Sequence, residues 1–164
     1  MKKLTKVLGI TILSAMLAFL CACGQQNGQA TDDAQKQVCT LTIKCETILK
    51  NMDKLNPEKK DLIPETGIIF SSDNVSFSQG DSLFDILKQE LQKEKIHMAF
   101  VENTSSGTTY IEGINNIYAA DCGELSGWIY MVNGESVYEG CTEYFPQNGD
   151  VIEWVYTCDM GNDI

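Results

Sequence analysis

Cysteine is the residue type with the widest chemistry in this 164-residue sequence, and five of its seven cysteines lie beyond residue 38. Cys39 and Cys45 are six residues apart on one predicted strand, a span of about 20 Å that excludes a bridge between them. Cys122 and Cys141 flank a predicted hairpin, and their bridge would close a loop of about 20 residues and contribute roughly 3 kcal/mol. Cys45 with Cys158 is a second candidate pair, which would join the first and last strands. The alternative is that all five are small, reduced core residues, and the odd number leaves at least one free thiol in either case.

Other signals for catalysis or metal binding are sparse. His97 is the single histidine, and it falls on the polar side of a predicted strand, where a surface residue is expected rather than a general base. No Cys-x-x-Cys pair or second histidine is present, so a zinc site is not expected. Glu135 and Glu139 could lie close together on a hairpin, but no loop has the ligand spacing of a calcium site. We therefore expect neither an enzyme nor a resident metal or cofactor.

Aromatic side chains gather in residues 102–164, which hold both Trp, all six Tyr and eleven acidic residues, but no Lys or Arg. Aromatic rings among acids suit a surface that stacks on a neutral or cationic ligand, a sugar or a protein partner. The alternative is that the rings form a core and the acids are solvated, and Trp154 is assigned to that core. The residues predicted to form a ligand-binding surface are Tyr110, Asn115, Asn116, Trp128, Tyr130 and Tyr138.

The N-terminal residues predict export. Three lysines precede an apolar run over 7–20, and these roughly 14 residues are fewer than the roughly 20 that span a bilayer. Residues 20–24, Leu-Cys-Ala-Cys-Gly, resemble the bacterial lipobox, which implies diacylglycerol attachment to the Cys23 thiol and cleavage before it. An ordinary signal peptide cut at the same place is the alternative. We predict a signal peptide over 1–22 and a lipidated Cys23 with a disordered tether over 23–37, at the extracytoplasmic face of a bacterial cell membrane.

The charge of the predicted mature chain excludes one class of partner. Beyond residue 22 there are nine Lys, no Arg and 23 Asp and Glu, a net charge of −14. Nucleic acid binding needs a basic surface, so nucleic acid is excluded. Direct docking on anionic lipid is also disfavoured, which leaves the lipid anchor as the attachment to the membrane. Export would permit disulfides.

The predicted folded part, 38–164, begins with a strand. Apolar and polar residues alternate over 39–46, which predicts a half-buried strand. The charged segment 48–60 predicts a helical turn and a surface loop, and 74–77 reads as a second short strand. The side chains of the first strand that are predicted to face inward are Cys39, Leu41, Ile43 and Cys45.

A helix is predicted next. Asp81 or Ser82 can cap it, with Asp85 as the partner in an approximate capping box. Its apolar side chains recur at helical spacing and form one stripe. The residues of that stripe are Leu83, Phe84, Leu87 and Leu91.

Strands are predicted for the remainder of the chain. Residues 96–100 alternate, and 128–132 is joined to a returning strand over 135–139 by Asn133 and Gly134, the strongest short hairpin signal. Residues 151–158 form a final strand. This order predicts an α+β domain, with a mostly antiparallel or mixed sheet packed by one main helix.

Four segments resemble one family of bacterial surface lipoproteins: 80–87 (GDSLFDIL), 113–118 (GINNIY), 122–134 (CGELSGWIYMVNG) and 148–157 (NGDVIEWVYT). These lipoproteins carry a domain of unknown function that is similar to the C-terminal domain of transcobalamin and intrinsic factor. The resemblance covers nearly all of 38–163 and implies a β-grasp architecture of the soluble-ligand-binding type.

In transcobalamin this domain closes over one face of cobalamin, while a large α-helical barrel, for which the present sequence has no segment, supplies most of the site. The resemblance therefore implies a binding lipoprotein that captures a small soluble ligand, with cobalamin or a related corrinoid as a candidate, for a membrane transporter or another surface protein. The alternative is a structural or adhesive module that contacts cell-wall glycan or a protein partner.

Overall fold

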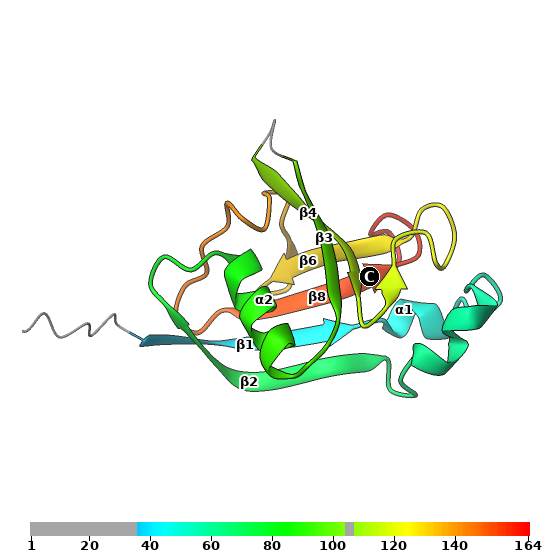
Figure 1. Ribbon diagram of the computed structural model, residues 1–164, viewed down its shortest axis with the longest axis horizontal. Coiled ribbons are helices and arrows are strands. Elements are labelled where there is room, and N and C mark those ends of the chain that lie inside the picture. The colour runs from blue at the N-terminus through cyan, green and yellow to red at the C-terminus, as the bar shows by residue number, and fades with distance from the viewer. Residues whose placement is uncertain (1–35, 104–106) are drawn as a thin grey trace, which may run out of the picture. The chain divides into compact units, whose positions relative to one another are not determined.

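Strands and one main helix form the folded part of the chain, for which the computed structural model describes residues 36–103 and 107–164 (Figure 1). The predicted signal peptide over 1–22, Cys23 and nearly all of the predicted tether lie outside these residues. The first strand begins at Lys36, two residues before the predicted start of the folded part at Val38. No helix in the described part of the chain is long and apolar enough to cross a membrane.

Five strands make up the large sheet: β1 (Lys36–Lys44), β2 (Ile68–Ser78), β6 (Gly127–Val132), β7 (Glu135–Ser136) and β8 (Val151–Thr157). Their order is β2-β1-β8-β6-β7. β1 pairs with β8 in parallel, and every other pairing in this sheet is antiparallel. The first and last strands therefore lie side by side, and both end at the same edge of the sheet.

Three strands make up the small sheet: β3 (Met98–Asn103), β4 (Thr108–Ile114) and β5 (Ile117–Tyr118). They pair antiparallel in chain order. Asn115 and Asn116 form the turn between β4 and β5 with φ of 52° and 60°, a conformation that Asn tolerates better than most residues. The mixture of strands and few helices confirms the predicted α+β class.

The helices are α1 (Glu46–Leu49), the 3₁₀ helix η1 (Pro57–Leu62) and α2 (Leu83–Lys93). The predicted cap of α2 is confirmed: the Asp85 N–H donates to Ser82 Oγ at 3.2 Å, and the Ser82 N–H donates to Asp85 Oδ2 at 3.0 Å. The predicted apolar stripe of α2 is buried. α2 therefore lies with this stripe against the core.

The core fills the space between α2, the small sheet and one face of the large sheet. The inward-facing side chains predicted for the first strand are all buried. Aromatic rings on β6 and β8 pack against each other in this core. The ring centroids of Trp128 and Tyr156 are 5.2 Å apart, and those of Tyr130 and Trp154 are 5.3 Å apart. Close aromatic pairs of this kind contribute beyond their buried area.

Candidate functional site

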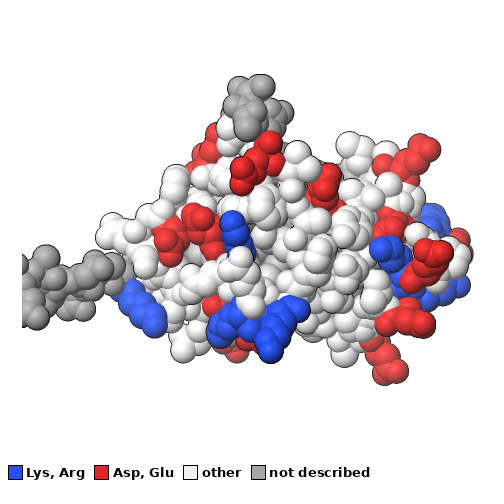
Figure 2. Space-filling model, viewed as in Figure 1, with Lys and Arg blue, Asp and Glu red and all other residues white. Residues whose placement is uncertain are grey.

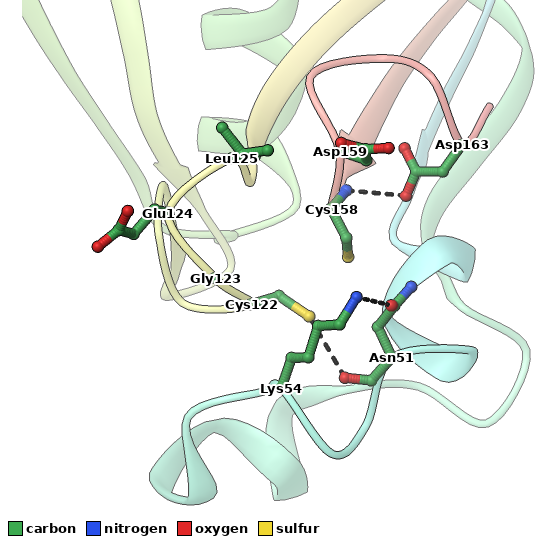
Figure 3. Close-up of a pocket in the computed structure, with 9 residues that line it drawn as sticks. All are labelled: Asn51, Lys54, Cys122, Gly123, Glu124, Leu125, Cys158, Asp159 and Asp163. Carbon is green, nitrogen blue, oxygen red and sulfur yellow. Dashed lines mark hydrogen bonds between the residues drawn. The ribbon is translucent and has the colours of Figure 1, made fainter.

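A cavity of about 430 Å³ lies at the edge of the large sheet where β1 and β8 end and β6 begins (Figure 3). Three connections meet there: the segment after β1, the loop that leads into β6, and the C-terminal turn after β8. The residues that line the cavity are Asn51, Lys54, Cys122, Gly123, Glu124, Leu125, Cys158, Asp159 and Asp163. The parallel pairing of β1 with β8 is what brings the first and the third of these segments together.

Hydrogen bonds to buried groups hold the loop that leads into β6. The Cys122 N–H donates to Ser126 Oγ at 3.1 Å, and the Ser126 hydroxyl donates to Gly123 O at 2.7 Å. Tyr156 on β8 contacts this loop. Its hydroxyl oxygen lies 2.9 Å from Ser126 Oγ, and the hydroxyl donates a hydrogen bond to Tyr118 O at 2.8 Å. Because Ser126 and Tyr156 are both buried, the loop has a fixed shape in which its polar groups are satisfied internally.

The C-terminal turn is held by Asp163. Its Oδ1 accepts from the Thr157 hydroxyl, and its Oδ2 accepts from the Cys158 N–H at 2.9 Å. Burial alone would raise the pKa of the Asp163 carboxyl, but these hydrogen bonds outweigh burial and hold the pKa below its ordinary value of 3.8. The carboxylate is therefore charged at neutral pH and serves to close the turn.

The segment after β1 forms the floor of the cavity. The Thr47 hydroxyl on α1 donates to Tyr156 O, and Asn51 Nδ2 donates to Thr47 O at 2.9 Å. Both cavity thiols contact this floor, since Cys122 Sγ lies 3.5 Å from Asn51 O and Cys158 Sγ lies 3.7 Å from Thr47 Oγ1. α1 and the residues that follow it are thus tied to β8 and to both thiols.

The charge of the lining favours neutral or cationic ligands. Lys54 is the one basic side chain among the lining residues, and Glu124, Asp159 and Asp163 are acidic. Lys54 Nζ donates to Asn51 Oδ1 at 2.9 Å. On the face shown in Figure 2, lysine side chains gather around α1 and η1, a segment with four of the nine described lysines, whereas residues 107–164 contain none. The cavity lies where these two parts of the chain meet.

Burial, followed by a hydrogen bond with Cys158, raises the pKa of the Cys122 thiol to about 12. Cys122 is therefore a neutral thiol at neutral pH, and such a thiol is a poor nucleophile. Among residues 36–103 and 107–164, no three His, Cys, Asp or Glu side chains come together in a way that could hold a metal ion.

The structure separates the six residues predicted to form an aromatic surface, and none of them lines the cavity. Trp128 and Tyr130 are only 4% and 6% exposed. Their polar atoms donate to backbone carbonyls: Trp128 Nε1 donates to Ile117 O at 2.9 Å, and the Tyr130 hydroxyl donates to Glu139 O at 2.7 Å. The expectation that these two rings face a ligand is therefore corrected, because they belong to the core.

The other four predicted residues lie at the surface or in turns. Tyr110 on β4 is half exposed, and Tyr138 is 98% exposed in the loop after β7. Asn115 and Asn116 make the β4–β5 turn, and Asn116 offers its backbone carbonyl to Lys59 Nζ at 2.7 Å. These residues form no single surface patch with the two buried rings.

All five described cysteines are free thiols. The predicted pair of Cys122 with Cys141 is not formed, because Cys141 Sγ contacts Thr109 O on β4 at 3.6 Å while Cys122 lies at the cavity floor. Cys45 and Cys158, the other predicted pair, lie at the same edge of the sheet and are not bridged either.

Sequence reasoning missed the cavity residues other than the cysteines. Asn51, Lys54 and Asp159 belong to no motif, and Leu125 lies in the segment 122–134 that resembles the family but was given no role there. The signal that could have located them is the neighbouring position of the first and last strands, which brings the segments that follow both strands to one edge.

Comparison with known proteins supports the family predicted from the sequence. Residues 80–158 match a family described as "Domain of unknown function (DUF4430)". No curated protein matches the sequence. A crystal structure of haptocorrin in complex with Cbi is similar in fold, with a TM-score of 0.55 and 14% sequence identity over 76% of this chain. The likeness covers 25% of the haptocorrin chain.

A second structure, of a candidate metal-binding protein from Ruminococcus gnavus ATCC 29149, gives a TM-score of 0.43 and 15% identity over 74% of this chain and 96% of that one. A TM-score of this size carries no argument about fold or ligand. The family match and the haptocorrin fold together confirm the predicted resemblance to a transcobalamin-like domain of unknown function.

Proposed function

We propose that this transcobalamin-like domain of unknown function is a binding module, which captures a small soluble ligand in the cavity between α1, the loop before β6 and the C-terminal turn. The cavity itself is the observation that carries the proposal. Its volume of about 430 Å³ lies within the roughly 300–1,000 Å³ of known ligand pockets. Its walls are held by internal hydrogen bonds, so the site exists before a ligand arrives.

The strand order supports a β-grasp architecture, which we also propose. A hairpin of β1 and β2 is followed by α2, and the last strand β8 inserts parallel to β1 in the centre of the sheet. The likeness to a quarter of the haptocorrin chain is consistent with this arrangement. Haptocorrin was crystallised with a ligand, which makes ligand binding the natural function to test for this chain.

Size and charge define the class of ligand. A cleft of this volume can hold a small molecule, whereas a corrinoid, with its macrocycle and side chains, is larger than the ligands that such a cleft holds. Acidic side chains outnumber Lys54 in the lining, which favours a neutral or cationic molecule. The lining contains no histidine and so offers no imidazole to act as a general base, and we propose binding without catalysis. A corrinoid would instead have to rest on the exposed rings of Tyr110 and Tyr138.

The predicted anchor gives this function its location. A lipidated Cys23 would hold the domain at the extracytoplasmic face of a bacterial membrane, and the segment before β1 would let it present the ligand to a transporter. A chain in which Cys23 is replaced by serine should leave the membrane fraction after expression in a bacterium that processes lipoproteins. Retention of the Cys23→Ser chain in that fraction would contradict the anchor.

A thermal-shift screen of residues 33–164 tests the ligand proposal. This segment is one compact unit with its own core, so it can be produced without the first 32 residues. The probes are neutral and cationic small molecules (amino acids, polyamines, nucleosides, sugars and quaternary amines), with cobalamin as a separate arm. A ligand at 100 times its Kd stabilises by about 2.7 kcal/mol, which corresponds to a rise in Tm on the order of 10 °C for a domain of this size.

Two variants identify the site. Leu125 is half exposed and lines the cavity, so Leu125→Arg should block the cavity and abolish the shift. Tyr138 is almost fully exposed and does not line the cavity, so Tyr138→Ala should leave the shift unchanged. The opposite pattern, with stabilisation by cobalamin alone and its loss in Tyr138→Ala, would place the site near Tyr138 and contradict the cavity. No stabilisation by any probe would contradict ligand capture.

One observation favours a second function, a module that contacts cell-wall glycan or a protein partner. Val101 and Tyr110 face each other across β3 and β4 and are 48% and 53% exposed, a pair that could stack on a partner. Retention of the domain on isolated cell wall, with loss of retention in Tyr110→Ala, would support this function over ligand capture.

A further inference from the structure

We infer that Cys122 and Cys158 are a disulfide-forming pair, which can cross-link the loop before β6 to the C-terminal turn at the floor of the cavity. This inference goes beyond ligand capture and does not depend on it. It replaces both pairs that spacing along the sequence favours. It also leaves Cys39, Cys45 and Cys141 as the free thiols of the described domain.

Contacts with α1 and with Asn51, which follows it, place the two sulfur atoms close together. Cys158 Sγ lies 3.7 Å from Thr47 Oγ1, and Cys122 Sγ lies 3.5 Å from Asn51 O. Thr47 and Asn51 are neighbours on one turn of chain, joined by the hydrogen bond from Asn51 Nδ2 to Thr47 O at 2.9 Å. The Cys158 thiol lies close enough to help raise the pKa of the Cys122 thiol, and Figure 3 shows both sulfur atoms directed into the same space.

Access from solvent separates this pair from the alternative of Cys45 with Cys158. Cys122 and Cys158 both line the cavity, whereas Cys45 does not. Cys45 and Cys122 are both close enough to Cys158 for the thiols to influence each other's pKa, but only Cys122 shares the cavity lining with Cys158. A small oxidant that enters the cavity therefore meets Cys158, which is 7% exposed, and Cys122 next to it.

The reaction is thiol–disulfide exchange with a small-molecule disulfide as the oxidant. The Cys158 thiol loses its proton to solvent, and the thiolate attacks one sulfur atom of the oxidant and releases one equivalent of small thiol. Cys122 then loses its proton and attacks the Cys158 sulfur of the mixed disulfide, which releases the second equivalent. The two cysteines are oxidised by two electrons and the oxidant is reduced by two, so that one protein disulfide and two small thiols are formed. Because burial raises the pKa of Cys122 to about 12, the second step is expected to be slow at neutral pH.

The test is to map the bridge in the native domain. Residues 33–164, with five thiols, are incubated with excess oxidised glutathione at pH 8, quenched in acid, alkylated and digested without reduction. Mass spectrometry should find a peptide that links Cys122 to Cys158, and the number of titratable thiols should fall from five to three. A bridge between Cys45 and Cys158, a bridge to Cys141, or five remaining unlinked thiols would overturn the inference.

Variants give a second readout. Cys141→Ser removes a thiol outside the cavity, so its remaining four thiols should fall to two with the same linked peptide. Cys122→Ser removes the resolving thiol, so Cys158 should accumulate as the mixed disulfide with glutathione, a mass increase at one residue. An internal bridge in Cys122→Ser under the same conditions would contradict the assignment. Because the unsubstituted domain carries the primary measurement, the test does not depend on any variant folding.

Discussion

Tyr156 is the side chain on which the walls of the cavity depend most, and its replacement by phenylalanine is a sharp test of the site. The ring is fully buried on β8 and packs edge-on against Trp128. Its hydroxyl lies between Ser126 Oγ at 2.9 Å and Tyr118 O at 2.8 Å. Tyr156→Phe keeps the ring and removes only the atom that joins β8 to the loop before β6.

The expected loss of stability follows from counting protons. The Tyr156 and Ser126 hydroxyls make three contacts: with each other, with Tyr118 O, and with Gly123 O, to which Ser126 donates at 2.7 Å. The two hydroxyls have only two protons to donate, so at most two of these contacts are hydrogen bonds at one time. The substitution removes one donor, and a net hydrogen bond contributes about 0.5–1.5 kcal/mol. Tyr118 O is not left without a donor, since the Asp121 N–H also reaches it at 3.2 Å. The larger penalty for an orphaned buried acceptor, about 1–3 kcal/mol, therefore does not apply, and we expect a loss of about 1 kcal/mol.

Urea unfolding of residues 33–164 measures this loss as a lower midpoint at unchanged slope, by roughly 0.5 M for a slope of about 2 kcal/mol/M. Tyr138→Phe is the matched control: it makes the same chemical change on a ring that is 98% exposed, so its effect should stay within about 0.5 kcal/mol. Ser126→Ala should couple to Tyr156→Phe by about 0.5 kcal/mol or more in a double-mutant cycle. If Tyr156→Phe and Tyr138→Phe have the same effect, or if Tyr156→Phe and Ser126→Ala add without coupling, the network does not hold the loop.

Three further predictions concern the backbone and the titrating groups. Gly67 has φ of 71°, and an added Cβ would lie 2.8 Å from the Glu46 Cα, so Gly67→Ala should lower the free energy of unfolding by about 3 kcal/mol or more. The control is Gly134→Ala, at φ of 82° with nothing within 4 Å of the added Cβ, which should lower it by only about 1–2 kcal/mol. Equal losses in chemical unfolding would contradict the clash at Gly67. Burial, with smaller effects of nearby carboxylates, raises the pKa of Cys39 from 9.0 to about 11. The unfolded chain therefore loses this proton first, and stability that is complete below pH 9 is lost between pH 9 and 11. Cys39→Ala should reduce that slope by up to about 1.4 kcal/mol per pH unit, measured by urea unfolding in reductant, and an unchanged slope would exclude the thiol as its cause. Hydrogen bonds lower the pKa of Asp163 despite its burial, so its contribution is present above pH 4 and disappears as the pH falls below 3.8. Asp163→Asn should lose about 1.5 kcal/mol at pH 7 and much less at pH 3 in thermal melts, whereas a deficit independent of pH would show that the charge is not involved.

Local patterns were sufficient to predict the elements that sequence neighbours determine. The alternation that begins at Cys39 predicted β1 and its buried face, and Ser82 with Asp85 predicted the start of α2. Asn133 and Gly134 predicted the β6–β7 turn, in which both residues have positive φ. The small sheet was harder to predict, because β5 has only two residues and β4 is stabilised by pairing with β3 rather than by its own pattern.

The site was predicted poorly because its determinants are long-range. Trp128 and Tyr130 occupy alternate positions on β6, and Val132 completes the same buried face. Because alternate residues of a strand point to the same side, this spacing was itself a signal that both rings belong to the core. The concentration of aromatic residues in the C-terminal half reflects this core. The cavity could not be located from local patterns, because its lining comes from three segments that are far apart in the sequence. The pairings of β8 with β1 and with β6 bring these segments together.

This pairing also explains why the cavity is formed without a ligand. The segment after β1 and the turn after β8 leave the sheet at one edge, and the loop before β6 enters it there because β6 is antiparallel to β8. Tyr156, on β8 just before the C-terminal turn, contacts the other two segments: its backbone carbonyl accepts from the Thr47 hydroxyl, and its hydroxyl contacts Ser126 in the loop. Walls tied to one buried residue of a central strand move little, so a ligand that fits the cavity has little ordering cost to overcome. The same rigidity limits the site to ligands that match its volume, which is why size should decide between a small cation and a corrinoid.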